Sequence, residues 1–584
     1  MKKIRITLAL VAAASLCLLG TAVQANAQIA PTISLNADKA VYAPGDLVNF
    51  TANTAGATGM KLALQYFSLN KVLKRQTVSV ESDGTTSFSW QPPANDYTGY
   101  LLQANLLKGK TVVAGATFGI DVSSDWGKYP RYGFLSDFSS RNQADQAAII
   151  AKLGRLHING LQFYDWQDRH DQPLTLVDGS PVSQWQDIAG RPTYLATVNN
   201  YITSAHASGI KAMNYNLIMG AYDNYASLGI SPTWGVYTDQ AHQNQAGWPL
   251  PSSWESGLQL FDPNNVDWQN YIIGQEQIVA SKLPFDGWHV DQLGSSDVYD
   301  YNGNSVDLAA GYASLLSKAK TTLGQDLVMN AVDDYGQAEI ASSKSTKFAY
   351  EELWANNSTF SDILNLVETN WRSASGRQNT VLAAYVNRGI SASSGRFNPP
   401  GVLLADAAIF AAGGSHLEMG EHMLSNEYFP NSNLSTSSAL NKSLTTYYDF
   451  SVAYENLLRG EVTSTSVPLT VKGHKMALDR VVEPGSLWSF ARRTADKKTT
   501  VIHLLNLERS ATDNWRDDDA TQKSPKSLSK LTVKFKMATK VNKVWAASPD
   551  ANGGAPVSLK FSQSKGFVTL TLPSLTYWSM LVAQ

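Results

Sequence analysis

Two carboxylates stand in short apolar runs that are typical of buried strands. Asp291 closes residues 285–291 (FDGWHVD), and Glu352 lies near the end of residues 348–354 (FAYEELW). A carboxylate at the end of a parallel barrel strand faces a solvent-filled mouth, which is where such barrels place catalytic groups. Two carboxylates on separate strands are the minimum equipment for cleaving a glycosidic bond. The alternative interpretation is that each is a helix cap or a loop carboxylate.

The alternation of side chains along a strand predicts which residues face the barrel cavity. In the first run, Trp288 and Val290 suit the side that packs against helices. In the second run, the same parity selects Glu352 over the neighbouring Glu351. The side chains that this parity directs into the cavity are His289, Asp291, Tyr350, Glu352 and Trp354.

Other strand ends carry groups that could bind a sugar. Residues 162–170 (QFYDWQDRH) combine aromatic rings with side chains that hydrogen-bond hydroxyl groups; a polar loop with incidental aromatics is the alternative. Residues 214–216 (NYN) close another run, and Asp333 and Asp334 are a rival source of the catalytic acid. The predicted substrate-binding residues are Tyr164, Asp165, Trp166, His170, Asn216, His289, Tyr350, Trp354, Tyr385 and Glu418.

Two segments resemble metal sites without matching them. Residues 416–422 (HLEMGEH) hold two His and two Glu, but their spacing is not H-E-x-x-H. Residues 300–307 (DYNGNSVD) lack the sixth-position glycine and terminal glutamate of a calcium loop, so they favour a turn. We therefore expect no metal, and cleavage by two carboxylates needs no cofactor.

Eight strand candidates alternate with helical stretches after Arg131. The candidates are residues 132–138, 160–166, 211–219, 287–293, 326–332, 348–354, 381–387 and 415–419. Helices are expected at residues 142–156, 268–283 and 306–323. Eightfold alternation predicts a (β/α)8 TIM barrel. A doubly wound sheet is the alternative, but no G-x-G-x-x-G or phosphate-binding G-x-x-x-x-G-K-[ST] motif follows any strand.

The barrel is flanked by segments with strand-like alternation and frequent turns. The first predicts an immunoglobulin-like β-sandwich, and the second, from about residue 468, predicts an antiparallel β domain. The charged loop at residues 513–526 is expected to be exposed. The predicted domains are a signal peptide (1–27), the N-terminal sandwich (28–124), the catalytic barrel (125–465) and the C-terminal β-sandwich domain (466–584).

The first residues predict export. Lys2, Lys3 and Arg5 precede an apolar stretch too short to span a bilayer, and Ala25-Asn26-Ala27 is an A-x-A cleavage site. Cleavage after Ala27 would remove Cys17, the only cysteine, which excludes disulfides and thiol catalysis in the mature protein. We expect a secreted or periplasmic monomer that has no membrane association after cleavage.

The charge and the aromatic content of the chain indicate which classes of binding partner to expect. The predicted signal peptide holds three basic and no acidic residues, which leaves 44 basic and 49 acidic residues and a formal charge of −5. There is no basic run or basic–aromatic stripe, so nucleic acid is not an expected partner. The chain has 15 Trp and is 10% aromatic, which fits stacking on sugar rings but equally fits a large core.

Five segments together resemble glycoside hydrolase family 66, the endo-dextranases and cyclising isomaltooligosaccharide glucanotransferases. They are residues 130–134 (PRYGF), 162–166 (QFYDW), 287–291 (GWHVD), 350–354 (YEELW) and 416–431. The resemblance implies Asp291 as nucleophile, Glu352 as general acid/base and Asp165 as an essential aspartate beside the attacked glucose. Gln167 and Asp168 depart from the family pattern, where larger apolar residues are expected.

The resemblance implies a retaining endo-hydrolase that cleaves the α-1,6 linkages of dextran to isomaltooligosaccharides. Cyclising members carry a large carbohydrate-binding insertion in the catalytic domain, and no stretch here has room for one, which favours hydrolysis. Two alternatives stay open. One is a cyclising or transferring enzyme, and the other is a non-catalytic glucan-binding protein.

Overall fold

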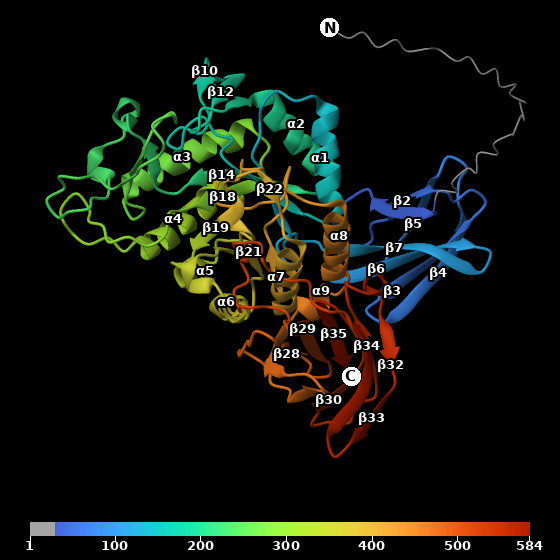
Figure 1. Ribbon diagram of the computed structural model, residues 1–584. Coiled ribbons are helices and arrows are strands. Elements are labelled where there is room, and N and C mark those ends of the chain that lie inside the picture. Colours follow the sequence, from blue (N-terminus) through green and yellow to red (C-terminus); the bar gives the residue numbers. More distant parts are fainter. Residues whose placement is uncertain (1–29) are drawn as a thin grey trace, which may run out of the picture.

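The computed structural model describes residues 30–584, so the predicted signal peptide and Cys17 lie outside the described residues. A parallel barrel is flanked by two regions of mainly antiparallel sheet (Figure 1). No helix in the described part of the chain is long and apolar enough to cross a membrane. Strands of the N-terminal region end at Val122, and those of the C-terminal region begin at Val462. The predicted domain limits stay predictions.

Eight strands form one parallel sheet in the order β23-β21-β20-β19-β18-β14-β9-β8. They are β8 Tyr132–Leu135, β9 Gly160–Phe163, β14 Lys211–Leu217, β18 Gly287–Asp291, β19 Asp326–Val332, β20 Ala349–Glu352, β21 Thr380–Ala383 and β23 Gly414–His416. The N–H of Phe134 in β8 donates to the carbonyl of Met419, just after β23, at 3.2 Å, so the sheet is nearly closed. Every strand overlaps its predicted run, which confirms the barrel.

Helices cover the outside of the barrel. They are α1 Gln143–Arg155, α2 Leu195–Ala207, α3 Val266–Lys282, α4 Leu308–Leu323, α5 Gln337–Ser342, α6 Phe360–Ser373, α7 Pro399–Ala412 and α8 Ser438–Ala453, followed by the short α9 Glu455–Leu458. Asn142, Asn265 and Asp307 begin α1, α3 and α4, because each side chain accepts a first-turn N–H that has no partner within the helix. These three helices match the predicted ones.

Long loops at the carboxyl ends of the strands hold small sheets of their own. The loop after β9 carries β10 Leu176–Val177, β11 Ser180–Pro181, β12 Gln184–Gln186 and β13 Pro192–Tyr194. The loop after β14 carries β15 Gly220–Tyr222, β16 Gly247–Trp248 and β17 Leu258–Leu260, in the order β15-β17-β16. β22 Gly395–Arg396 pairs with β24 Leu434–Ser435. These loops give the barrel mouth its walls.

The N-terminal region consists of two antiparallel sheets around one apolar core. The sheet β1-β2-β5 is made of Thr32–Ala37, Val48–Ala55 and Thr85–Trp90. The sheet β4-β3-β6-β7 is made of Lys71–Ser79, Lys61–Ser68, Thr98–Lys108 and Thr111–Val122. Phe50 and Phe88 of the first sheet share the core with Tyr66 and Phe118 of the second. The immunoglobulin-like topology stays a prediction.

The C-terminal region also has two sheets. One contains β25 Val462–Thr465, β27 Met476–Leu478, β28 Leu487–Thr494, β29 Thr500–Asn506, β31 Val544–Ala547, β32 Val557–Leu559 and β35 Trp578–Ala583. The other contains β26 Leu469–Val471, β30 Leu528–Lys536, β33 Phe561–Ser564 and β34 Phe567–Leu575. All pairs are antiparallel except β27 with β28. The expected antiparallel β region is therefore present with one parallel pair.

Buried ion pairs fasten the N-terminal sheets to the barrel. The Arg131 guanidinium donates to Asp121 at the end of β7 at 2.6 Å and lies 3.4 Å from Glu455 of α9. Helix α8 contacts β6 and β7, and α7 contacts β29, so both outer regions meet the same side of the barrel (Figure 1). Removing one member would leave a buried charge without its partner, so we expect the loss of Arg131 to weaken this contact.

Candidate active site

A cavity of about 550 Å³ opens at the carboxyl ends of the barrel strands. Nine of the twelve residues predicted for the site line it: Tyr164, Asp165, His170, His289, Asp291, Tyr350, Glu352, Trp354 and Tyr385. Trp288 and Val290 lie instead in the core cluster that includes Trp268 of α3 and Leu315 of α4. The side-chain parity predicted for residues 287–291 is thus the observed one.

Asp291 ends β18 and is held by three donors. Its Oδ2 accepts from the hydroxyl of Tyr215 at 2.6 Å, and its Oδ1 accepts from the Asn330 amide and from the N–H of Gln292, both at 2.9 Å. Burial raises the pKa of Asp291, while the hydrogen bonds from Tyr215 and Asn330 oppose that rise. The three donors stabilise the ionised carboxylate and offset part of the effect of its burial.

Glu352 ends β20 and is less strongly held in the ionised form. Its Oε1 accepts from the Tyr385 hydroxyl at 2.7 Å, and its Oε2 accepts from the Asn330 amide at 3.1 Å. Burial raises the pKa of Glu352 to about 7, and the negative charge of Asp291 contributes to the rise. A carboxyl with this pKa can hold a proton near neutral pH and release it to a substrate.

One amide nitrogen joins the two carboxylates. Because Asn330 Nδ2 lies 2.9 Å from Asp291 Oδ1 and 3.1 Å from Glu352 Oε2, those two oxygens are at most about 6.0 Å apart. His289 lies below them, stacked between the rings of Tyr132 and Tyr215 at 5.7 and 5.8 Å. Burial lowers the pKa of His289 to about 3, so the imidazole is neutral and adds no charge to the pair.

Asp165 follows β9 and lines the same cavity. Its φ of 49° lies in the left-handed region, which turns the chain sharply between Tyr164 and Trp166. Burial raises the pKa of Asp165 to about 6, and the charge of Arg191 opposes the rise. Arg191 is itself anchored to Asp187 at 2.6 Å.

Three predicted substrate-binding residues do not line the cavity and are corrected here. Trp166 is buried against Trp185 and Phe285, and its ring N–H donates to Asn214 at 2.7 Å. Asn216 points to the helix side of β14, where its amide donates to Glu276 of α3 at 2.8 Å. Asn216 also accepts from His170 at 2.9 Å, so it supports a residue of the cavity without reaching the cavity itself.

Glu418 is the third predicted substrate-binding residue that does not line the cavity. It is buried on the side of the barrel that α8 covers, where it accepts from the Tyr448 hydroxyl of α8 at 3.0 Å. Asp406, His416 and Glu418 bring one potential ligand atom each within 4.8 Å of one another. The His416 ring already contacts Asp406 and the Ala384 carbonyl, both at 2.7 Å. None of the three lines the cavity, so the cluster has no direct part in its chemistry.

The rival carboxylates are engaged elsewhere. Glu351 is fully buried on the helix side of β20, beside Asn370 of α6. Asp333 accepts from the N–H groups of Trp354 and Asn356 at 3.1 and 3.0 Å, which fixes the turn after β20. Neither these two nor Asp334 lines the cavity. The structure therefore brings only Asp291 and Glu352 together among the candidate catalytic pairs.

Some residues that line the cavity are not among the predicted substrate-binding residues, although Tyr215 lies in the stretch 214–216 noted above. The parity of residues 211–217 and 326–332 directs Tyr215 and Asn330 inward, because their neighbours Asn214 and Ala331 face the helices. Aromatic residues 428 and 429 come from the long loop after β23, and Phe429 stacks on Tyr164 at 4.4 Å. No strand pattern marks such loop residues.

The C-terminal region also reaches the site. The expected exposure of residues 513–526 is wrong for Trp515 and Arg516, which are buried. Arg516 donates to the Leu353 carbonyl at 2.9 Å and to the Tyr385 carbonyl at 3.5 Å, next to Glu352 and its hydrogen-bond partner. Its guanidinium lies 5.9 Å from the Trp354 ring. Contacts with a distant part of the chain, which local charge does not reveal, decide this burial.

Comparison with known proteins identifies the family. The profile of glycosyl hydrolase family 66 matches residues 37–582. A cycloisomaltooligosaccharide glucanotransferase of Niallia circulans is 29% identical over 703 positions, which take in 93% of this chain and 71% of that protein. A dextranase of Streptococcus salivarius is 25% identical, over 83% of this chain and 67% of that protein.

The fold agrees with a solved structure. The crystal structure of a cycloisomaltooligosaccharide glucanotransferase from Paenibacillus sp., complexed with cycloisomaltoheptaose, superposes with a TM-score of 0.88. The superposition covers 94% of this chain and all of that one, at 24% identity. The resemblance noted in the sequence is confirmed, and the chain belongs to glycosyl hydrolase family 66.

Proposed function

We propose that this protein is an exported endo-dextranase that hydrolyses α-1,6-glucosidic bonds of dextran to linear isomaltooligosaccharides and retains the anomeric configuration. The observation that carries the proposal is the pair of carboxylates joined by Asn330 in the mouth of the barrel. Retaining enzymes hold their two carboxyl groups about 5–5.5 Å apart, and inverting enzymes about 6.5–9.5 Å. An upper limit of about 6.0 Å between one oxygen of each group supports retention.

In the first step, a carboxylate oxygen of Asp291 attacks the anomeric carbon and forms a glycosyl ester. The bond between that carbon and the linking oxygen breaks, and Glu352 gives its proton to the departing oxygen. The raised pKa of Glu352, about 7, favours the protonated acid that this step needs. Asp165 is proposed to hold a hydroxyl of the attacked glucose, which its place in the cavity supports.

In the second step, Glu352 takes a proton from water, and the water oxygen attacks the anomeric carbon. The ester bond breaks, the Asp291 carboxylate is restored, and a reducing sugar leaves with the original configuration. Once Asp291 is esterified it no longer carries a charge that raises the pKa of Glu352. Glu352 is then a carboxylate at the pH where it was an acid before, which suits its second role.

Transfer to a sugar hydroxyl instead of water is the competing function, because two similar proteins from Niallia circulans are glucanotransferases. The alignment with the Niallia circulans glucanotransferase that is 29% identical spans 703 positions, more than the 584 residues of this chain. That relative therefore carries segments without a counterpart here. This supports the interpretation that a carbohydrate-binding insertion is missing and that hydrolysis is the main reaction.

Product analysis tests the proposal. The purified protein is incubated with dextran, pullulan and starch, and the products are separated by chromatography while the first anomer formed is read by NMR. Linear isomaltooligosaccharides from dextran with an α-anomeric reducing end are expected. Cyclic products would establish the transferase instead. Dextran binding without any reducing sugar would establish a non-catalytic glucan-binding protein.

A further inference from the structure

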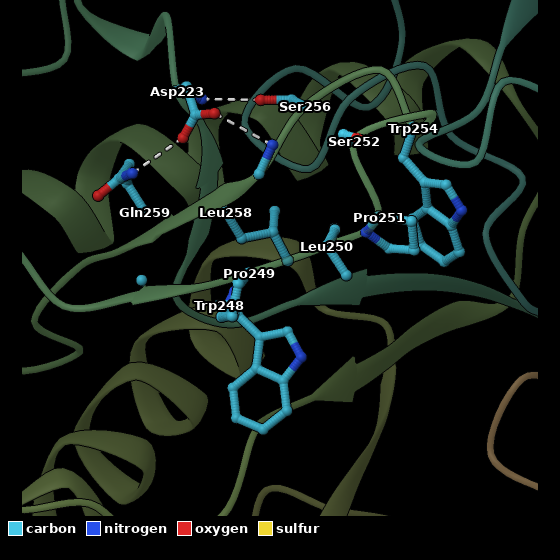
Figure 2. Close-up of a pocket in the computed structure, with 12 residues that line it drawn as sticks. Asp223, Trp248, Pro249, Leu250, Pro251, Ser252, Trp254, Ser256, Leu258 and Gln259 are labelled. Carbon is cyan, nitrogen blue, oxygen red and sulfur yellow. Dashed lines mark hydrogen bonds between the residues drawn. The ribbon is translucent and has the colours of Figure 1, made fainter.

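A second hollow of about 530 Å³ lies in the loop that follows β14 (Figure 2). It shares lining residues with the catalytic cavity. Its lining combines apolar and polar side chains from one stretch of chain plus Asp223. The lining residues are Asp223, Trp248, Leu250, Trp254, Leu258 and Gln259, together with the intervening glycines, prolines and serines. We call this hollow the Trp248 groove.

The Trp248 groove adjoins the catalytic cavity. Four side chains line both hollows: Trp248, Leu250, Trp254 and Leu258. A polymer that extends from the cavity over these side chains would reach the groove. Endo-acting cleavage of a long chain requires an open path of this kind on at least one side of the reacting bond.

Trp248 is the feature that needs an explanation. It is 48% exposed, and among the 15 Trp residues, all of which lie within the described residues 30–584, it alone is largely exposed. Exposing a large apolar ring to water is unfavourable, and such surfaces commonly mark binding sites. Sugar rings present flat C–H faces that pack on aromatic rings, so an exposed indole at the edge of a glucan cavity suits a glucosyl unit.

The groove is held in one shape by its own hydrogen bonds. Trp248 stands on β16, whose backbone pairs with Leu258 of β17. The Asp223 carboxylate accepts from the Gly257 N–H at 3.1 Å and from the Gln259 amide at 2.8 Å, and the Asp223 N–H donates to Ser256 at 2.9 Å (Figure 2). A fixed aromatic ring with polar groups nearby binds a sugar at a lower entropic cost than a mobile loop would.

We infer that the Trp248 groove is an outer subsite that binds glucosyl units of the α-1,6-glucan chain beyond those in the catalytic cavity, with one unit stacked on Trp248. This inference rests on the proposed dextran hydrolysis. It identifies the loop after β14 as the element that makes the enzyme prefer long chains. Substrates too short to reach the groove gain nothing from it.

The first test compares substrate lengths. Wild type, Trp248→Ala, Trp248→Phe and the control Trp371→Ala, which alters a half-buried Trp of α6 outside both hollows, are assayed on dextran and on the shortest isomaltooligosaccharide that wild type cleaves. In Trp248→Ala the ratio of kcat/KM on dextran to that on the short substrate should fall about tenfold, and Trp248→Phe should restore most of it. An unchanged ratio in Trp248→Ala would overturn the inference.

The second test needs no turnover. The full-length Glu352→Gln protein, with and without Trp248→Ala, is titrated with dextran by calorimetry. Weaker dextran binding by about tenfold in the double variant supports the subsite even if wild type fails to cleave dextran, in which case only the proposed function falls. Equal binding by both proteins, alongside normal cleavage by wild type, removes the subsite and leaves the proposed function standing.

Discussion

Asp291 and Glu352 share one hydrogen-bond donor, the side-chain amide of Asn330 on the strand between theirs. The amide can satisfy a carboxylate on each side only if both strand ends direct their last side chains into the barrel. The shared donor thus limits the distance between the two carboxylates. The Tyr215 hydroxyl donates to Asp291 alone, and the Tyr385 hydroxyl donates to Glu352 alone. Burial raises the pKa of both carboxyl groups, and that of Glu352 reaches about 7, so Glu352 can hold a proton near neutral pH.

Removing each carboxylate should give opposite stereochemistry with azide. Asp291→Ala leaves a space beside the anomeric carbon, so azide entering there should yield an inverted glycosyl azide. In Glu352→Ala, azide should intercept the ester formed on Asp291 and yield a product of retained configuration. Dextran turnover in Glu352→Ala should fall by at least roughly 10²–10⁴-fold, and a substrate with a good leaving group should suffer less.

NMR of the azide products and initial rates check these outcomes. Glu351→Ala and Asp334→Ala are the matched controls, because both residues lie near Glu352 but outside the cavity. Loss of activity in either control, with activity kept in Glu352→Ala, would reassign the acid.

The pH profile should be bell-shaped, with its alkaline limb set by Glu352. The acid must be protonated, and burial raises its pKa to about 7, so kcat/KM should fall as the pH rises through about 7. Asn330→Ala removes a hydrogen bond that lowers this pKa, so the alkaline limb should move to higher pH while the rate falls. Rates measured across the pH range for both proteins test this. A shift to lower pH would contradict the assignment.

Asp165→Asn should reduce dextran turnover by about 10²-fold or more while the fold stays intact, because a charged acceptor at the attacked sugar is lost. Asp178→Asn is the matched control, since Asp178 has a similar backbone φ of 51° but is exposed and distant from the cavity. Initial rates and thermal unfolding of both variants check this. Activity near the wild-type level in Asp165→Asn would remove Asp165 from the sugar contact.

Arg516→Lys should slow dextran cleavage about tenfold, because the single ammonium nitrogen of lysine cannot reproduce the planar group whose two nitrogens each reach one carbonyl. The loss should be much smaller on a good-leaving-group substrate, since Arg516 acts through the position of Glu352. Arg509→Lys, an exposed change in the same region, is the control. Equal losses on both substrates would point to general destabilisation and not to positioning.

Glu418→Gln should flatten the dependence of stability on pH. Burial and the charge of Asp406 raise the pKa of Glu418 from 4.5 to about 8, so the folded protein holds this proton more tightly than the unfolded chain. Its stabilising contribution is complete below about pH 4.5 and is lost as the pH rises towards 8. Calorimetry should therefore find a smaller decrease in Tm between these pH values in Glu418→Gln, while the exposed control Glu339→Gln behaves as wild type. If Tm decreases by the same amount in Glu418→Gln as in wild type, the proton on Glu418 does not contribute to the pH dependence of stability.

Local patterns in the sequence determined the barrel and its carboxylate pair. Strand-length apolar runs that alternate with helical periods specify a (β/α)8 fold, and a side-chain period of two placed Asp291 and Glu352 inward and Glu351 outward. The same parity excludes Asn216 and Glu418 from the cavity, because their neighbours Tyr215 and Leu417 occupy the barrel interior.

Only the tertiary structure decided what the loops contribute. The positive φ of Asp165 turns Trp166 into the core, and a charged loop from the C-terminal region buries Arg516 beside Glu352. Trp248 is exposed on β16, whereas Leu258 and Leu260 of the paired strand β17 are buried. The periodicity of strands and helices can be read from residues that are close in the sequence. Loop positions depend instead on contacts between segments more than a hundred residues apart, such as Arg516 with Leu353. No local pattern encodes such contacts.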